Sequence, residues 1–148
     1  MHRNGEFRIL NLEPHGYSLK ARTLLESLGQ VDDGPLDRAA LLESIQHYDI
    51  LLVRLGHKID AAVLAAAPRL KTIVTATTGL NHIAVDEAAN RGITVLSLAG
   101  AKEFLESVYA TAEHTWALLL ALTRNLPQAI VHVLSGGWER DEFKGFEL

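Results

Sequence analysis

Short apolar runs alternate with amphipathic segments through the first two thirds of the chain. Four of these runs show no regular polar alternation, which is typical of parallel strands covered on both faces. They are Phe7 to Leu12, Tyr48 to Val53, Leu70 to Thr75 and Ile93 to Leu96. A further strand is predicted over Gln30 to Asp33, although its polar residues make its pattern the least regular of the five.

The segments between these runs have helical spacing. In Tyr17 to Leu28 four leucines recur at helical intervals, and Gly29 is expected to end this amphipathic helix as its C-cap. Three more helices are predicted: one after the N-cap Asp37 that contains Ala40, Leu41 and Ile45, one over Asp60 to Ala67, and one over Val85 to Arg91 that ends at Gly92. This alternation predicts an α/β fold over residues 1–100, a flavodoxin-like parallel sheet with helices on both faces.

The pattern changes beyond residue 100. Leu105 to Thr123 is predicted as one long helix, and its second half from Trp116 is apolar on every side. The side chains of such a helix are expected to be buried by packing against another domain or another subunit. Pro127 suits the first turn of a further helix closed by Gly136 and Gly137, and a polar arm follows. Residues 101–148 are therefore predicted to form a helical extension.

The loops after the strands are the expected ligand-binding positions, because parallel sheets meet small molecules at the carboxyl ends of their strands. The turn of Thr77, Thr78 and Gly79 follows one buried strand, and Arg54 follows another. Backbone N–H groups of this turn would meet a small molecule there. If the chain has a binding site, the sequence places part of it at this edge.

Composition excludes several classes of partner and site. A net charge of −4 without a Lys/Arg cluster argues against nucleic acid and against an anionic membrane surface. The absence of cysteine excludes disulfides and thiolate metal sites, and His57, His82 and His114 are not at mutual ligand spacing, so no metal is assigned. With no secretory signal and no apolar run long enough to span a bilayer, a cytoplasmic protein is expected.

Three motifs carry a resemblance to a known family. TATTGLNHIAVDEAANRGITVLSL, TAEHTWALLLALTRNLPQA and SGGWERDEFKGFEL occur in this order. They resemble the amino-terminal part of the NAD-dependent D-isomer-specific 2-hydroxyacid dehydrogenases, the D-3-phosphoglycerate dehydrogenase-like group. The resemblance implies an oxidoreductase that transfers hydride between NAD and a small 2-hydroxy or 2-oxo acid. It also implies that residues 101–148 are the start of a truncated NAD-binding domain. A homodimer contact through the helix from Val108 to Thr123 is implied as well.

The resemblance extends to single residues. Gly79 and Leu80 match a loop whose backbone N–H groups would bind the carboxylate of the substrate, and Arg54 matches an arginine that reaches the acidic end of the substrate. Thr78 and Thr111 match positions close to the nicotinamide of the cofactor. The alternative to a binding role is a turn glycine for Gly79 and a surface ion pair for Arg54.

The sequence also lacks parts of the family pattern. No GxGxxG motif is present, and the family's catalytic arginine, histidine and glutamate match no residue here, so no catalytic residue is assigned. The chain alone is therefore expected to be inactive. Thr77, Asn81, His82 and Ser97 differ from the usual family residues, so the sequence does not identify the acid.

Two alternatives to an enzyme part remain. One is a stand-alone flavodoxin-like domain that binds a small acid. The other is a non-catalytic fragment that dimerises through the apolar helix. Among stand-alone domains of this fold, neither a receiver domain nor a flavodoxin fits, because Val53 and Arg54 replace the phospho-accepting aspartate and residues 13–16 do not form a phosphate loop. The dimerising fragment is supported by the apolar helix, which would otherwise be exposed.

Overall fold

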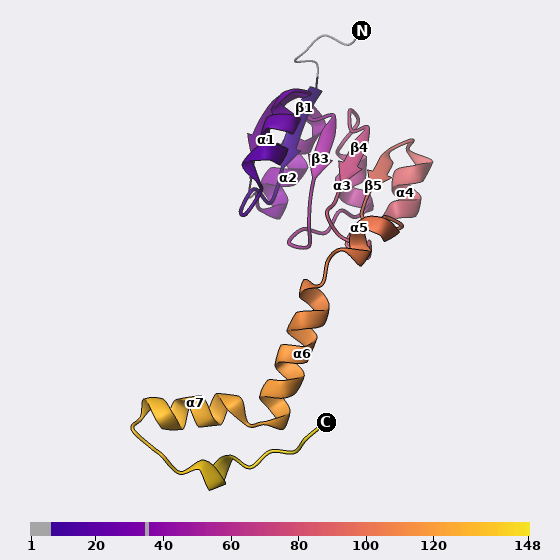
Figure 1. Ribbon diagram of the computed structural model, residues 1–148. Helices are drawn as coiled ribbons and strands as arrows, with labels where there is room; N and C mark the ends of the chain where they lie inside the picture. The colour runs from indigo at the N-terminus through magenta and orange to yellow at the C-terminus, as the bar shows by residue number, and fades with distance from the viewer. Residues whose placement is uncertain (1–6, 35) are drawn as a thin grey trace. The chain divides into compact units, whose positions relative to one another are not determined.

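The computed structural model describes residues 7–34 and 36–148, which fall into two compact units. The first unit is Met1–Ala101 and the second is Lys102–Leu148. Figure 1 shows the sheet of the first unit and the helices of the second.

The first unit is built on a five-stranded parallel sheet with the strand order β2-β1-β3-β4-β5. Its strands are β1 (Phe7–Asn11), β2 (Gly29–Asp33), β3 (Ile50–Leu52), β4 (Thr72–Val74) and β5 (Thr94–Leu96). The predicted parallel α/β fold is confirmed, including the polar strand β2. The four apolar runs were each predicted one to three residues longer than the strands that form.

Four α-helices and one 3-10 helix connect the strands. They are α1 (Leu19–Glu26), α2 (Arg38–Ser44), η1 (Ile45–His47), α3 (Ala61–Ala65) and α4 (Val85–Asn90). The step from β1 to β2 runs opposite to the later steps along the sheet, so right-handed crossovers place α1 on one face and α2 to α4 on the other. Consistent with this, α3 packs against both α2 and α4.

The hydrophobic core lies between the sheet and α2 to α4. Inward side chains of three neighbouring strands meet the apolar faces of these helices, and each fully buried aliphatic side chain contributes roughly 1.5–3 kcal/mol. The core includes Leu10, Leu12, Leu41, Ile45, Leu51, Val63, Leu64 and Ile73. The opposite face buries Ile9 and Leu52, while Leu96 on β5 stays 52% exposed.

Side-chain caps fix where three helices begin. Ser18 accepts a hydrogen bond from the N–H of Ala21, and the predicted cap Asp37 accepts one from the N–H of Ala40. Asp60 accepts from two N–H groups at the start of α3. Such caps are each worth about 0.5–2 kcal/mol. Gly92 has a φ of 71° after α4, which confirms it as the residue that ends that helix.

The prediction for Gly29 was wrong. The helix before it ends at Ser27, and Gly29 is the first residue of β2, where it pairs with Phe7. A Cβ at this position would overlap the backbone carbonyl of Phe7. Glycine is therefore required by the close approach of two strands and not by a helix end. The leucines of α1 are also more exposed than an amphipathic helix predicts, since Leu19 is 82% exposed.

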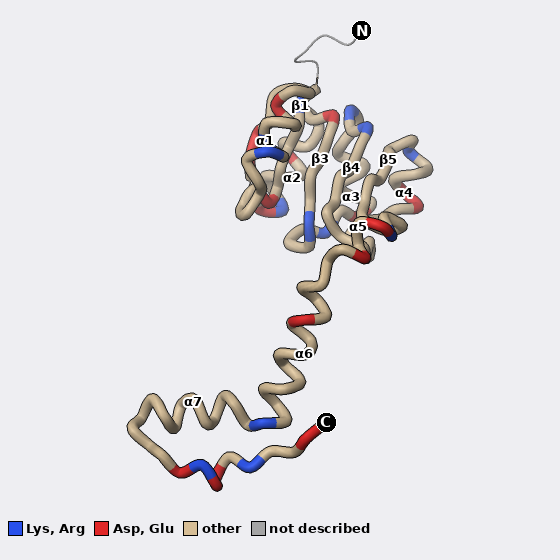
Figure 2. Tube along the Cα trace, viewed as in Figure 1, with Lys and Arg blue, Asp and Glu red and all other residues tan. Residues whose placement is uncertain are grey.

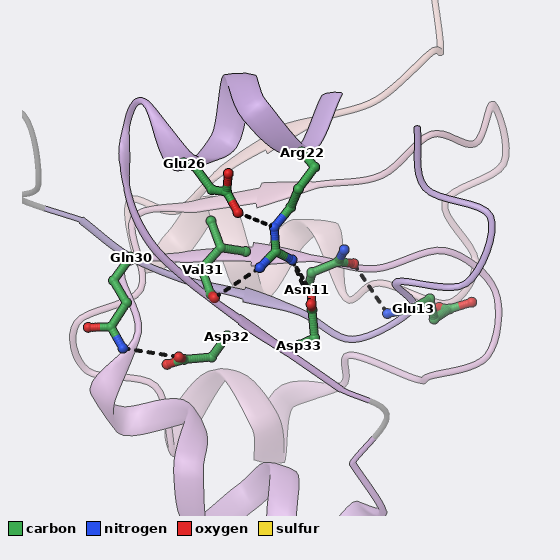
Figure 3. Close-up of polar contacts among 8 residues, drawn as sticks. All are labelled: Asn11, Glu13, Arg22, Glu26, Gln30, Val31, Asp32 and Asp33. Carbon is green, nitrogen blue, oxygen red and sulfur yellow. Dashed lines mark hydrogen bonds and ion pairs between the residues drawn. The ribbon is translucent and has the colours of Figure 1, made fainter. Parts of the chain in front are cut away.

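Ion pairs hold the polar strand β2 in place. Arg22 on α1 donates from Nη1 to the carboxylate of Asp33, from Nε to Glu26, and from Nη2 to the backbone carbonyl of Val31, as Figure 3 shows. Arg8 on β1 pairs with Asp32 at 2.7 Å. These polar side chains explain why β2 forms without an apolar run.

The second unit consists of α5 (Lys102–Glu106), α6 (Ala110–Thr123), α7 (Leu126–Leu134) and the 3-10 helix η2 (Arg140–Phe143). Most of the residues in α6 and α7 are uncharged, as the tan trace in Figure 2 shows. Pro127 lies in the first turn of α7, as predicted, and Gly136 ends this helix with a φ of 88°.

One prediction for this unit was wrong. The predicted helix from Leu105 to Thr123 is interrupted, because residues 107–109 separate α5 from α6. Large apolar side chains on α6 are exposed, among them Leu118 and Leu122.

Among the described residues no single helix is long and apolar enough to cross a membrane. Only two segments taken together, Lys102–Thr123 and Leu126–Leu134, have the length and the apolar composition of a membrane span. They are bent by 68° at their junction.

Candidate functional site

Two loops lie side by side at the carboxyl ends of β3 and β4. At one end the N–H of Val53 donates to Val74 (N···O 3.0 Å), and at the other the N–H of Ile59 donates to His82 (N···O 2.7 Å). An isolated parallel bridge joins Ile59 to Ile83 beyond them. The loops after the two strands are therefore fixed to each other at both ends.

A pocket of about 870 Å³ opens between these loops. Residues 55–58 line it from the first loop, residues 76–79 with Asn81 and His82 line it from the second, and Leu98 completes it. The pocket lies at the edge of the sheet where the sequence predicted a ligand. This is the usual position for a binding site in an open parallel sheet.

Hydroxyl groups fix the second loop. Thr75, which is buried at the end of β4, lies with its Oγ1 3.0 Å from Oγ1 of Thr77. Thr77 in turn donates from its hydroxyl to the carbonyl of Gly79 at 2.8 Å. The loop is also joined to the segment after β5, because the N–H of Leu98 donates to Thr77.

The glycine of this loop is not in the left-handed region of φ. A Cβ on Gly79 would meet a single side-chain atom, Oδ1 of Asn81, at 3.2 Å. The N–H groups of Gly79 and Leu80 donate no hydrogen bond within the part of the chain that the structure describes. Both groups are therefore available to an acceptor such as a carboxylate oxygen.

The lining side chains favour an anion. Lys58, His57 and His82 contribute cationic or hydrogen-bonding groups, and no aspartate or glutamate is among the lining residues. Nε2 of His82 lies 3.5 Å from Oγ1 of Thr75. Coulomb attraction in a partly enclosed pocket favours an acidic ligand.

The structure brings only part of the predicted site together. Thr78 and Gly79 line the pocket, whereas Arg54 and Leu80 adjoin it without being lining residues. Arg54 is exposed, and its backbone N–H donates to Glu13. Thr111 lies in the first turn of α6 in the second unit, where its carbonyl accepts from the hydroxyl of Thr115. The roles predicted for these residues stay predictions.

Sequence reasoning did not select Lys58 or the two histidines as part of this pocket. Lys58 comes four residues after Arg54 at the same strand end, and that position was the available signal. Among the residues with described positions, no group of three or more His, Asp or Glu side chains converges in a way that would hold a metal.

Two known enzymes are similar to this chain in sequence. The chain is 40% identical over 116 residues to D-3-phosphoglycerate dehydrogenase of Mycobacterium bovis, which covers 78% of this chain and 21% of that enzyme. It is 41% identical over 108 residues to glyoxylate reductase of Thermofilum pendens, with 73% of this chain and 30% of that enzyme covered. The chain thus spans less than a third of the length of these two curated relatives.

A solved structure extends the comparison. D-lactate dehydrogenase of Aquifex aeolicus, in complex with NAD and lactic acid, superposes with a TM-score of 0.77 at 23% identity, which covers 95% of this chain and 41% of that one. This similarity establishes a shared fold. The model of the catalytic domain of the D-isomer-specific 2-hydroxyacid dehydrogenases matches residues 14–136 of this chain. The chain belongs to the D-isomer-specific 2-hydroxyacid dehydrogenase family.

Proposed function

We propose that this chain is the substrate-binding part of an NAD-dependent D-2-hydroxyacid dehydrogenase, and that its pocket binds a small 2-hydroxy or 2-oxo acid. The observation that carries the proposal is the pocket after β3 and β4. Its lining combines Lys58 with two histidines and contains no acidic residue. The N–H groups of Gly79 and Leu80 beside it donate no hydrogen bond to any residue whose position the structure describes. This chemistry is complementary to a carboxylate.

Each polar group has a proposed role in this reaction. The N–H groups of Gly79 and Leu80 bind one end of the carboxylate, while Arg54 and Lys58 provide positive charge from the opposite loop. Thr78 and Thr111 are proposed to lie close to the nicotinamide ring in the complete enzyme. Binding of this kind orients the acid, which is the contribution that a substrate domain makes to hydride transfer.

A binding site for the dinucleotide itself is not proposed for the residues of this chain. The sequence has no GxGxxG motif, and the single sheet in the described residues has the strand order of the substrate domain. We therefore propose that NAD is held by another part of the full-length protein. The chain alone is expected to bind acid without catalysing turnover.

A second function is proposed for the second unit. The exposed apolar side chains of α6 would pair with those of a second copy to form a homodimer. An apolar helix without cover favours association, since burial of its side chains removes them from water.

Acid binding and turnover test the first proposal. We expect nuclear magnetic resonance titration of the 148-residue chain with glyoxylate to shift the amide signals of Gly79 and Leu80. We expect no oxidation of NADH in the same mixture. Shifts elsewhere but not in this pocket, or measurable NADH oxidation by the purified chain, would contradict the proposal.

Arg54→Ala tests whether the Arg54 side chain contributes to glyoxylate binding. An arginine–carboxylate contact is worth about 1.5–3 kcal/mol, so the variant should weaken glyoxylate binding at least about tenfold. Arg91→Ala is the control, because Arg91 pairs with Glu87 on α4 and does not line the pocket. If the two variants bind glyoxylate with equal affinity, the role proposed for Arg54 is wrong.

A further inference from the structure

A carboxylate outside the pocket holds the first loop of the candidate site. Glu13 follows β1, and its Oε1 accepts two backbone hydrogen bonds from the loop after β3. The N–H of Arg54 lies at 2.7 Å and the N–H of Gly56 at 3.2 Å from this one oxygen. Hydrogen bonds to a charged acceptor are the stronger kind in proteins.

The close packing of this contact explains a glycine in the loop. A Cβ on Gly56 would lie 3.2 Å from Oε2 of Glu13 and 3.3 Å from its Cδ. Both are tighter than ordinary van der Waals contact, so a larger residue would require the Glu13 carboxylate to shift by a few tenths of an ångström. Gly56 is also a lining residue of the pocket. The same residue therefore donates to the carboxylate and lines the pocket.

Glu13 is itself held by the end of β1. Its backbone N–H donates to Oδ1 of Asn11 at 3.3 Å, a contact drawn in Figure 3. Asn11 is only 2% exposed and lies in the middle of the sheet, between β2 and β3. The backbone of Glu13 is thus tied to an interior strand of the sheet.

The other end of the same loop has separate anchors. Nη1 of Arg38 donates to the carbonyl of Lys58 at 3.0 Å, and the Arg38 guanidinium pairs with Asp60. Ile59 makes the backbone contacts to the neighbouring loop described above. Glu13 accordingly contacts the first part of the loop, at Arg54 and Gly56, while Arg38 and Ile59 make the contacts at its end.

We propose that Glu13 is a positioning residue for the acid-binding pocket, acting through the backbone of Arg54 and Gly56. This inference rests on the proposed function, since it assigns the loop to acid binding. With the carboxylate in place, the loop is ordered before the acid binds. Binding then does not include the loss of conformational entropy that ordering the loop would require. Without it, only the fraction of molecules with the correct loop conformation binds.

Amide hydrogen exchange of the ligand-free chain tests the positioning role directly. In Glu13→Ala we expect the N–H groups of Arg54 and Gly56 to exchange at least about tenfold faster than in the unsubstituted chain. Glu13→Gln should keep most of the protection, because its amide carbonyl presents an acceptor at the same reach. Unchanged exchange of both groups in Glu13→Ala would overturn the proposal.

Glu26→Ala is the matched control. Its carboxylate also accepts from an arginine and lies in the same unit, but it contacts α1 and not the pocket loop. This variant should leave the two amides unchanged. If Glu13→Ala does not fold, Glu13→Asp keeps the charge and shortens the reach by one methylene, and loss of protection at Arg54 and Gly56 is again expected.

Glyoxylate titration separates this proposal from the proposed function. We expect Glu13→Ala to weaken binding about fivefold or more, while Glu26→Ala binds normally. A drop in Tm alone, with exchange and affinity unchanged, would mean that Glu13 is merely structural and would overturn its role. Absence of glyoxylate binding in the unsubstituted chain would instead refute the proposed function, and the exchange data would still decide whether Glu13 orders the loop.

Discussion

Leu122→Arg in α6 should convert a dimer of this chain into monomers. Leu122 is 76% exposed and neighbours Leu118, which is 59% exposed on the same helix. Burying one leucine is worth about 1.5–3 kcal/mol, and a two-fold symmetric interface contains each substitution twice. The dimer dissociation constant should therefore rise by at least about 100-fold. Sedimentation equilibrium over a range of protein concentrations measures this change.

The control for this experiment is Leu19→Arg. Leu19 is the most exposed leucine of α1 and lies in the first unit, so it reports on non-specific effects of an added arginine. It should leave the dissociation constant unchanged. If the unsubstituted chain sediments as a monomer, the proposed dimer is wrong. If Leu19→Arg dissociates a dimer instead, the contact is made by α1.

Asp49→Ala should lower the free energy of unfolding by about 1–3 kcal/mol. Asp49 is 3% exposed at the amino ends of the strands, and its carboxylate accepts from the backbone N–H of Arg8 at 3.0 Å. Arg69 and Lys71 pair with it at 3.2 and 3.5 Å. Removing the carboxylate leaves the N–H of Arg8 without its acceptor. Urea unfolding monitored by circular dichroism measures the loss.

The same carboxyl group makes stability depend on pH. Burial raises the pKa of Asp49, but the N–H of Arg8 and the charges of Arg69 and Lys71 outweigh it and hold the pKa below its ordinary value. Its stabilisation is then present above the ordinary carboxyl pKa of about 4 and is lost as the pH falls through the lower pKa of the folded chain.

Asp49→Asn should therefore reduce the loss of stability between about pH 5 and pH 2. Asp37→Asn is the control, because asparagine caps a helix as well as aspartate does and this carboxylate is exposed. A pH profile of Asp49→Asn that parallels the unsubstituted chain would contradict the assigned role.

The apolar pattern was sufficient to predict the order of strands and helices in the first unit. Runs such as Tyr48 to Val53 are long enough to be recognised locally, and caps such as Asp37 give the helix starts. Gly29 was misassigned because a glycine after a helical segment fits a C-cap equally well. Its real constraint is the carbonyl of Phe7, a residue 22 positions earlier in the sequence, which no local pattern contains.

The site could be predicted to the level of its loops. Thr78 and Gly79 were found because they follow a buried strand, and the structure places them in the pocket. Lys58 was missed although it follows the same strand as Arg54. Glu13 was missed because its role depends on a contact between segments far apart in the sequence. Glu13 reaches a loop 41 residues later, and only the folded sheet brings the two together.

The outer strand of the sheet also bears on aggregation. β2 lies at the edge beyond β1, where an apolar strand would offer unpaired backbone groups to another molecule. Here the guanidinium of Arg22 already donates to the carbonyl of Val31, and the carboxylates of Asp32 and Asp33 are paired with Arg8 and Arg22. A second copy that approached strand to strand would have to displace the Arg22 side chain from Val31. This edge of the sheet is thereby protected against the growth of intermolecular β-structure.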